Sequence, residues 1–301
     1  GNSMDTGIQN EYVIHILNNQ IQWDSNIEGI IVKDTSITFL ENSPKQIRVE
    51  IEIGNETHVE YQFSKRSHLE LIETRTSLQN GSLNRKIVVE QDANVAMLVL
   101  DETKHDVKCH DEVETYENAN LESAYAELSL SQVDGKFDYY LKGEGANVNV
   151  KVGALAANDY KKHYEISLFH QAPLTYGQMD NYGVTKDHSE LVFDGVGKID
   201  KGMSQSSSHQ TSKIIVFDPT CKAKANPYLY IDEYDVKASH AAGVGKMDED
   251  HLFYLESRGL SKNAAMKLIT YGYLMPVVNV ISNPTLKEAF EALLEKRMGD
   301  E

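Results

Sequence analysis

The residue of this sequence best suited to chemistry is His240, which stands between a strand-like segment and a glycine-rich run. It shortly follows Y-L-Y-I-D-E-Y-D-V-K and directly precedes Ala241, Ala242 and Gly243. Such small neighbours leave an imidazole room to face a ligand or another chain, and a neutral imidazole can bind a metal or accept a proton. A histidine at the end of a strand is more often structural, so the residues alone leave both roles open.

The glycines after His240 resemble a phosphate-binding loop but do not form one. A P-loop needs the pattern G-x-x-x-x-G-K-[ST], in which backbone N–H groups hold phosphates and the final hydroxyl binds magnesium. In this chain Gly245-Lys246 is followed by Met247, where a hydroxyl residue is required. The position five before Gly245 is His240 rather than glycine. Any ATP chemistry connected with this protein must therefore come from another chain.

Two further groups of residues could bind a metal or act through a thiol. His105, Cys109 and His110 could place soft ligands near one another around a turn, although the acidic residues nearby suit a solvated loop equally well. Cys221 lies in the turn D-P-T-C-K-A-K beside lysines that could activate it, but a lone thiol in a turn is usually inert. Two distant cysteines without a C-x-x-C pattern fit a reducing cytoplasm and cannot supply four thiolates for an iron–sulfur cluster.

Composition and charge exclude several classes of function. The chain has 301 residues, of which 41% are hydrophobic and 25% charged, as is typical of a soluble globular protein. The net charge of −17 argues against a nucleic-acid partner, which requires a basic surface, and against an anionic membrane surface. No apolar run approaches the ~20 residues of a membrane span. The motifs of serine hydrolases, zinc proteases and dinucleotide-binding proteins are also missing.

From about residue 12 to residue 240 the sequence consists of short β-type segments separated by Asn, Asp and Gly. Apolar residues alternate in most of them, as in I-R-V-E-I-E-I and V-N-V-K-V, and this alternation is typical of strands. Ala93-Asn94-Val95, Ala119-Asn120-Leu121 and Ala146-Asn147-Val148 recur at spacings of 26 and 27 residues. A repeat of about 20–50 residues predicts a solenoid of stacked strands. The alternative is a β-sandwich with coincidental Ala-Asn turns.

The C-terminal part of the chain predicts helices instead. Asp248-Glu249-Asp250 forms an acidic first turn that complements a helix dipole, and Gly259 ends this helix. Ser261 caps a second short helix that ends at Gly272. Asn283-Pro284 opens a third helix with one apolar face. The predicted organisation is a disordered N-terminus with a candidate tag remnant at 1–11, a β-helix core domain at 12–244 and a C-terminal helical domain at 245–301.

The longest motif is the run N-P-Y-L-Y-I-D-E-Y-D-V-K-A-S-H-A-A-G-V-G-K-M-D-E-D-H-L-F-Y-L-E-S-R-G-L-S at 226–261. It strongly resembles the C-terminal signature of the SufB/SufD family, whose members are scaffold subunits of the SUF machine for iron–sulfur cluster assembly. H-Q-A-P-L-T at 170–175 and V-G-K-I-D-K-G-M at 196–203, with Gln210, resemble earlier motifs of this family. The resemblance covers about residues 165–301 well and the first half only in its β-rich character.

The resemblance implies a mainly β fold, a right-handed parallel β-helix followed by a small α-helical domain, which agrees with the pattern of segments. In the family the helical domain docks an ABC-type ATPase, SufC, and this explains why the chain lacks an ATP-binding loop. We expect Phe253, Tyr254, Glu256 and Arg258 to form the docking surface. Phe253, Tyr254 and Leu255 cannot all face one side of a helix, so part of this cluster should pack inward.

The resemblance also distinguishes between the two kinds of subunit. SufB-like chains carry a cysteine where this chain has Ser212 and a glutamate where it has Ala241. A hydroxyl cannot carry a persulfide or act as a soft thiolate ligand. SufD-like chains keep the signature histidine without those two groups, commonly with a cysteine at the position of Ala238. The resemblance therefore indicates a SufD-like chain in which His240 is the one functional side chain carried over.

From this resemblance we expect a non-enzymatic, cytoplasmic scaffold subunit of the SUF system. It would pair with a SufB-like subunit along the edge of the β-helix, so that His240 faces the partner's thiolate as an iron ligand or proton acceptor. Without that partner, two copies would form a dimer near 205–245. The isolated chain would hold no cofactor, and an iron–sulfur cluster would form transiently in the complex. The alternative is a degenerate member that docks the ATPase as a binding module without cluster chemistry.

Overall fold

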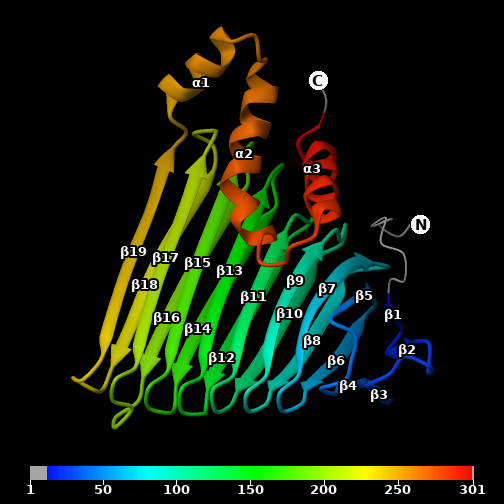
Figure 1. Ribbon diagram of the computed structural model, residues 1–301. Helices are drawn as coiled ribbons and strands as arrows, with labels where there is room; N and C mark the ends of the chain where they lie inside the picture. The colour runs from blue at the N-terminus through cyan, green and yellow to red at the C-terminus, as the bar shows by residue number, and fades with distance from the viewer. Residues whose placement is uncertain (1–11, 300–301) are drawn as a thin grey trace.

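The structure, a computed structural model, describes residues 12–299, and the segment 1–11 that we expect to be disordered lies outside the described residues. Between these limits the chain winds as a parallel β-solenoid of about seven turns and then forms three helices (Figure 1). Each turn adds one strand to a ten-stranded sheet, called sheet A here, and one to a nine-stranded sheet, called sheet B. The predicted parallel β-helix with a small C-terminal helical region is confirmed.

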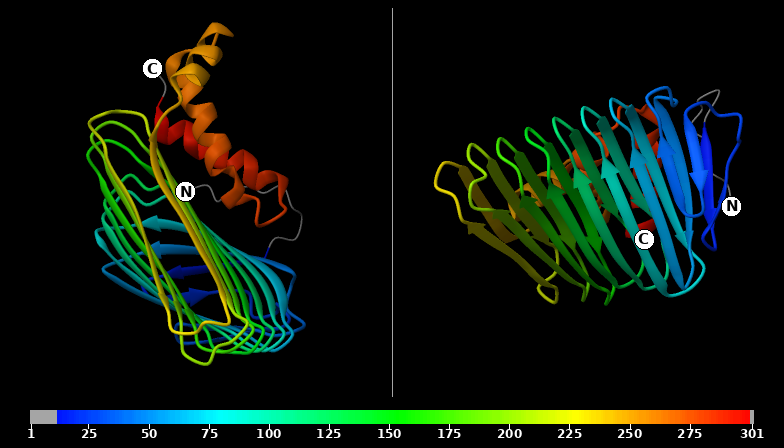
Figure 2. Two further views of the ribbon diagram at one scale, coloured as in Figure 1. Left: turned by 90° about the vertical axis from the view of Figure 1, so that its left-hand side faces the viewer. Right: turned by 90° about the horizontal axis from the view of Figure 1, so that it is seen from below.

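The two sheets form the long sides of a flattened coil when the solenoid is seen along its axis (Figure 2). Sheet A contains, in spatial order, β2 (Gln20–Gln22), β1 (Val13–Leu17), β5 (Gln46–Ile53), β7 (His68–Ser77), β9 (Asn94–Asp101), β11 (Asn120–Glu127), β13 (Asn147–Ala156), β15 (Tyr176–Thr185), β17 (Ser207–Val216) and β19 (Lys237–Lys246). Sheet B contains β3 (Ile30–Lys33), β4 (Ser36–Phe39), β6 (Glu56–Phe63), β8 (Gly81–Val89), β10 (Val107–Thr115), β12 (Val133–Leu141), β14 (Lys161–His170), β16 (Glu190–Ile199) and β18 (Lys222–Ile231).

The Ala-Asn repeat marks one corner of the coil. Asn94, Asn120 and Asn147 begin β9, β11 and β13 and stand in register in sheet A. The alanine before each of them is fully buried. The residue before that alanine has a positive φ, 59° at Asp92 and 53° at Asn118, and Asp and Asn tolerate this left-handed conformation better than most residues. The repeat thus encodes a tight corner followed by a small buried side chain, and the β-sandwich alternative is wrong.

The turns of the solenoid lengthen toward its C-terminal end. Strands that are neighbours in sheet A are offset by 26 residues between Asn94 and Asn120 and by 31 residues between Tyr176 and Ser207. The strands lengthen as well, from five residues in β1 to ten in β13 and in β19. The last coils are therefore the broadest.

The two ends of the solenoid differ in whether a short antiparallel strand covers the last strand of each sheet. At the N-terminal end, β2 pairs antiparallel with β1 and β3 pairs antiparallel with β4, so a short strand closes each sheet. At the other end, among the described residues, β19 pairs only with β17 and β18 only with β16. All ten residues of β19 are exposed. This edge is open, and an open edge presents unpaired backbone N–H and C=O groups.

Three helices follow the last strand, and two of them cover part of the outer face of sheet A (Figures 1 and 2). They are α1 (Glu249–Ser257), α2 (Lys262–Val278) and α3 (Pro284–Met298). The side chains of Asp248, Ser261 and Asn283 accept hydrogen bonds from backbone N–H groups of the first turns, as N-caps do. The helix starts therefore agree with the sequence prediction.

One helix is longer than predicted. The sequence predicts an end at Gly272, but α2 continues through this glycine to Val278. Leu274 and Val277, which lie beyond Gly272, are buried and pack against Gly153 of β13, where an added Cβ would be 2.8 Å from Val277. Burial of this apolar face outweighs the low helix propensity of glycine. The strand β19 also ends at Lys246, two residues past the predicted domain boundary.

Candidate functional site

His240 lies in the middle of β19, the edge strand at the open end of sheet A. Its register partner on the neighbouring strand β17 is Gln210. Gln210 is only 4% exposed and points, with Ser208 and Ser212, into the space between the two sheets. Residues paired in a ladder point to the same face of a sheet. His240 therefore faces the inner side of the terminal coil, which no further coil covers in the described part of the chain.

The backbone at His240 is directed toward the open edge. The N–H of Lys237 donates to the carbonyl of Ser206, on the side of β17. In a parallel ladder, alternate residues direct their N–H and C=O groups to the same neighbour. The odd-numbered residues of β19 consequently pair with β17, whereas the N–H and C=O groups of His240 and Ala242 point outward. His240 thus combines an inward-facing side chain with a backbone available to an incoming strand.

Ser212, the position at which the resemblance implies a cysteine in SufB-like chains, lies on β17, the strand next to that of His240. Ser212 is buried on β17, and its Oγ accepts a hydrogen bond from Nδ2 of Asn181 at 3.1 Å. Ser212 is the register partner of Ala242, which shares the inner row of β19 with Ala238 and His240. Neither β17 nor β19 contains a cysteine. Neither strand therefore offers a thiolate beside His240.

The two cysteines of the chain lie elsewhere and form no metal site. Cys109 is buried in the interior, whereas the next residue, His110, points outward from β10. Nδ1 of His105 lies 2.7 Å from the hydroxyl of Ser77. His105, Cys109 and His110 therefore do not come together, and residues 12–299 contain no cluster of three or more His, Cys, Asp or Glu suited to a metal ion. Cys221 donates to a backbone carbonyl at 3.3 Å.

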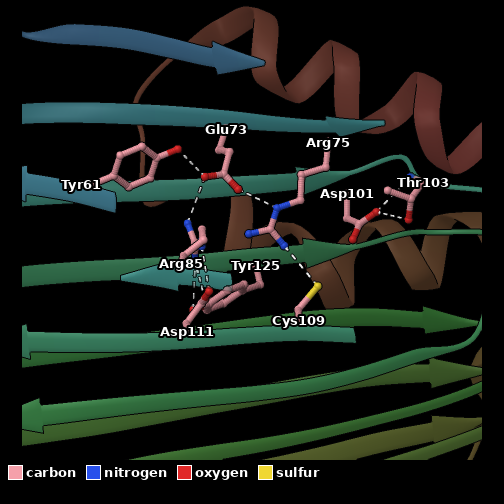
Figure 3. Close-up of polar contacts among 9 residues, drawn as sticks. All are labelled: Tyr61, Glu73, Arg75, Arg85, Asp101, Thr103, Cys109, Asp111 and Tyr125. Carbon is pink, nitrogen blue, oxygen red and sulfur yellow. Dashed lines mark hydrogen bonds and ion pairs between the residues drawn. The ribbon is translucent and has the colours of Figure 1, made fainter. Parts of the chain in front are cut away.

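A network of buried charges, which the sequence analysis did not identify, crosses the interior of the central coils (Figure 3). Glu73 accepts hydrogen bonds from Nε of Arg75 at 2.6 Å and from Nη1 of Arg85 at 3.2 Å. Arg85 also binds both carboxylate oxygens of Asp111, at 2.8 and 2.5 Å. The hydroxyl of Tyr125 donates to Asp111 at 2.5 Å. Each charged member thus has an oppositely charged partner, as burial requires.

The guanidinium groups of Arg75 and Arg85 keep the carboxylates of Glu73 and Asp111 ionised. Burial acts to raise the pKa of Glu73, but the guanidinium groups of Arg75 and Arg85 outweigh it and hold that pKa below its ordinary value. Burial has the same effect on Asp111, and Arg85 again outweighs it, so that the pKa of Asp111 is also lowered. Two guanidinium groups and two carboxylates therefore balance one another in the interior. This arrangement joins strands of neighbouring coils.

A second buried group lies along the neighbouring coils. Arg75, Asp101 and Glu127 are register neighbours on β7, β9 and β11. Burial, followed by the nearby carboxylate of Asp101, raises the pKa of Glu127 to about 8. Lys162 donates to two backbone carbonyls at 2.9 Å each, and burial lowers its pKa to about 8 despite the attraction of Glu127. Burial therefore favours the protonated, neutral form of Glu127.

The residues predicted to dock an ATPase lie on α1, with Arg258 at its C-cap, and α1 lies beyond the tips of the last strands of sheet A (Figure 1). This helix buries none of its residues. Phe253 is 72% exposed and Tyr254 is 53% exposed, and Glu256 and Arg258 are exposed beside them. The guanidinium carbon of Arg258 lies 5.2 Å from the ring centroid of Tyr254. Leu255 is partly buried, so the aromatic pair faces solvent while the leucine packs inward.

The sequence matches a known protein family. The model of a family described as "SUF system FeS cluster assembly, SufBD core domain" matches residues 41–273. The chain belongs to the SufBD family. The matched segment runs from β5 through the rest of the solenoid into α2, so the SufBD match also covers coils before residue 165, where the sequence motifs are weak.

Relatives of this SufBD-family chain include longer proteins. The protein named iron–sulfur cluster assembly protein SufD of Bacillus subtilis (strain 168) is 34% identical over 158 residues, which are 52% of this chain and 36% of that protein. A SufBD family protein of Mycobacterium tuberculosis is 30% identical over 138 residues, 46% of this chain and 16% of that protein. One of Staphylococcus saprophyticus is 26% identical over 194 residues, 64% and 42% of the two chains.

The chain spans less than half the length of these three curated relatives. Between residues 12 and 299 no helix is long and apolar enough to span a bilayer.

Proposed function

We propose that this SufBD-family chain is a SufD-like scaffold subunit of the SUF system, which pairs with a SufB-like subunit through the open end of its solenoid. The observation that carries the proposal is the fully exposed edge strand β19, with His240 at its centre. The opposite end is closed by antiparallel strands, so the C-terminal end is the one suited to receive a strand from a partner. Family membership supports iron–sulfur cluster assembly as the process that this pairing serves.

In this proposal His240 acts toward a cluster that is the cargo of the complex. The neutral imidazole contributes a nitrogen that can ligate iron or accept a proton. The partner supplies the thiolates, because β17 and β19 carry Ser212 and alanines at the corresponding positions. The chain catalyses no reaction of its own and serves to hold one side of the assembly site.

A SufC-type ATPase docks on α1 in the same proposal. Support comes from the exposed Phe253 and Tyr254, since aromatic side chains are enriched at the centres of protein interfaces. Glu256 and Arg258 supply charges at the rim of this surface. ATP binding and hydrolysis belong to the partner.

The test of the proposal is His240→Ala in a complex reconstituted anaerobically with a SufB-like subunit, iron and sulfide. We expect normal folding, partner binding and ATPase docking with a severe loss of cluster, because alanine offers no nitrogen ligand or base. His209→Ala is the matched control, since His209 lies on β17 but pairs outward with Ser239; it should leave the cluster yield unchanged. If His240 is only structural, its removal should lower stability by ~1–3 kcal/mol and spare the cluster. A normal cluster yield would refute the assignment.

A second candidate function is a degenerate binding module that docks the ATPase without cluster chemistry. The lack of a thiol on the two strands around His240 favours it. The same reconstitution separates the candidates. A scaffold increases the cluster yield of its SufB-like partner, whereas a pure binding module leaves that yield unchanged although the complex still forms.

A further inference from the structure

We propose that Asp101 and Glu127 share one proton inside the solenoid, and that this shared proton makes the attachment of α3 sensitive to pH. The two side chains lie side by side at the ends of β9 and β11. Arg297 of α3 holds the residue that follows each of them. The inference concerns the helical region and does not depend on the role proposed for His240.

The two carboxyl groups are buried together with too few hydrogen-bond donors. Asp101 is 0% exposed and Glu127 is 1% exposed. Oδ1 of Asp101 accepts hydrogen bonds from the backbone N–H of Thr103 at 2.9 Å and from its hydroxyl at 2.7 Å (Figure 3). Oδ2 of Asp101 and both carboxyl oxygens of Glu127 are buried and receive no hydrogen bond from the described residues. Buried polar atoms without a partner are rare and need an explanation.

A proton held between the two groups provides this explanation. The side chains of Asp101 and Glu127 are within hydrogen-bonding reach of each other. A carboxylate has no hydrogen to donate, so two carboxyl groups can form a hydrogen bond only when one of them is protonated. Carboxyl groups that share a site hold one proton more tightly than either would alone. The pair therefore titrates as one unit.

The charges of the interior balance only if the pair holds this proton. Among the described residues, three cations and four carboxyl groups are buried and face the interior: Arg75, Arg85 and Lys162, and Glu73, Asp101, Asp111 and Glu127. Arg48 and Asp138 are also buried, but they lie on the outer rows of their strands and pair with Glu50 and His110. His170 is neutral, since burial lowers its pKa to about 4. One proton on the four carboxyl groups removes the net charge, which would be strongly unfavourable in the interior.

Groups on three other strands face the pair. Arg75 of β7 is the ladder partner of Asp101. Lys162 of β14 attracts both carboxyl groups. Cys109 of β10 and Tyr164 of β14 are neutral neighbours, because burial raises the pKa of each. The cations are thus already in place, and the remaining negative charge is left to the proton.

Arg297, in the last turn of α3, joins the same two strand ends from the outer side of sheet A. Its Nε donates to the backbone carbonyl of Leu128 at 2.6 Å, and its Nη2 donates to that of Glu102 at 3.3 Å. These carbonyls belong to the residues directly after Glu127 and Asp101. The guanidinium group is rigid and planar. Both bonds therefore require the strand ends to keep the spacing that the shared proton maintains.

The sign of the pH effect follows from the two states of Glu127. Burial, followed by Asp101, raises its pKa to about 8, against the attraction of Arg75 and Lys162. When the strand ends separate, Glu127 reaches water, where its pKa is the ordinary 4.5, and the proton leaves. Between these values each unit of rising pH therefore favours separation by up to about tenfold. Arg297 then loses one of its two carbonyls, so α3 detaches more often at higher pH.

A ¹³C NMR titration of the chain, labelled at the side-chain carboxyl carbons of glutamate, tests the shared proton. The signal that disappears in Glu127→Gln is that of Glu127. We expect its midpoint to fall by at least about one pH unit in Asp101→Asn, because asparagine keeps the shape, removes the charge and donates an N–H to Glu127. Glu102→Gln, half-buried beside Arg297, is the control and should leave the midpoint unchanged. An unchanged midpoint in Asp101→Asn would mean that burial alone holds the proton and would overturn the inference.

Amide hydrogen exchange, corrected for the chemical exchange rate at each pH, tests the attachment of α3. Between pH 5 and pH 7, below the pKa of about 8 to which burial lowers that of Lys162, the protection of the α3 amides should fall by about tenfold or more. Glu127→Gln cannot ionise, and its amide N–H replaces the shared proton, so its protection should stay constant. Glu102→Gln should keep the fall. Constant protection in the unaltered chain, or an equal fall in Glu127→Gln, would disprove the link between the proton and α3.

Discussion

Arg85 and Asp111 form a two-point ion pair inside the solenoid, with Nε 2.8 Å from Oδ1 and Nη2 2.5 Å from Oδ2. The two residues are register partners on β8 and β10, and both are almost fully buried. The planar fork of a guanidinium group matches a carboxylate in this way, whereas an ammonium group does not. The pair joins one coil to the next where neither charge would be stable alone.

Removal of one member of this pair should be more harmful than removal of both. Arg85→Met leaves Asp111 buried without its cation, so we expect the free energy of unfolding to fall by ~3–5 kcal/mol. The double variant Arg85→Met/Asp111→Leu should lose less. Urea denaturation at neutral pH measures both values. Lys142→Met, which breaks an exposed ion pair with Glu114, is the control and should cost under ~1 kcal/mol; a double variant less stable than the single one would contradict the expectation.

The raised pKa of Glu127 predicts that stability falls as pH rises. A carboxyl whose pKa is higher in the folded state than its ordinary value of 4.5 contributes its full stability below that value and loses it as pH approaches about 8. Glu127→Gln, which cannot ionise, should not show this loss. Urea denaturation between pH 5 and pH 8 should reveal a difference between variant and unaltered chain that grows by more than ~1 kcal/mol. Parallel stability profiles would show that Glu127 does not titrate in this window.

The lowered pKa of Lys162 makes stability rise with pH, and it does so over a different pH range. Its contribution is complete above the ordinary lysine pKa of 10.5 and is lost as pH falls toward about 8. Measurements at pH 5–8 therefore report mainly on Glu127.

The open edge predicts a dimer of the isolated chain joined near 205–245. Light scattering at micromolar concentration should give twice the chain mass. Ala242→Pro removes an N–H that points away from β17, so the strand should stay in its own sheet while the pairing between chains is lost. Ala242→Ser occupies the same position and keeps the N–H, and it should remain dimeric. A monomeric unaltered chain, or a dimeric proline variant, would count against edge pairing.

The exposed residues of α1 predict where a SufC-type ATPase binds. Phe253→Ala should weaken the affinity at least tenfold, because central aromatic side chains commonly contribute ~2 kcal/mol or more. Glu256→Ala and Arg258→Ala at the rim should have smaller effects, and none of these variants should change the thermal midpoint, because α1 buries no residue. Glu291→Ala on α3 is the control. Unchanged affinity of all three variants in a calorimetric titration would place the docking surface elsewhere.

The solenoid could be predicted because its determinants are local and repeated. Asn120 stands two residues after Asn118, which has a positive φ, and corners with a positive φ recur once per turn. The end of α2 could not be predicted from Gly272, because what continues the helix is the burial of Leu274 and Val277 against β13, a contact distant in sequence.

The buried charged residues are harder to recognise from the sequence than the corners of the solenoid. Asp111 shares its side of β10 with Cys109 and Val113, which are apolar and buried, whereas its direct neighbours point outward. Arg85 likewise stands between Leu83 and Ile87 on the inner side of β8. A charge in the apolar row of a strand indicates a buried partner, but only the register shows which partner it is. No repeated pattern and no neighbouring metal-ligand residues marked His240 in the sequence. Its proposed role therefore depends on the resemblance.

The closed first edge and the open last edge give the solenoid a direction of growth. The hairpins made by β1 to β4 leave the ribosome before the later strands and provide a template on which each later turn can settle as it is synthesised. When β19 has been added, its outer backbone still presents the geometry that every earlier strand offered to its successor. Recruitment of a partner strand is then one more cycle of the process that built the fold, carried out by a second polypeptide.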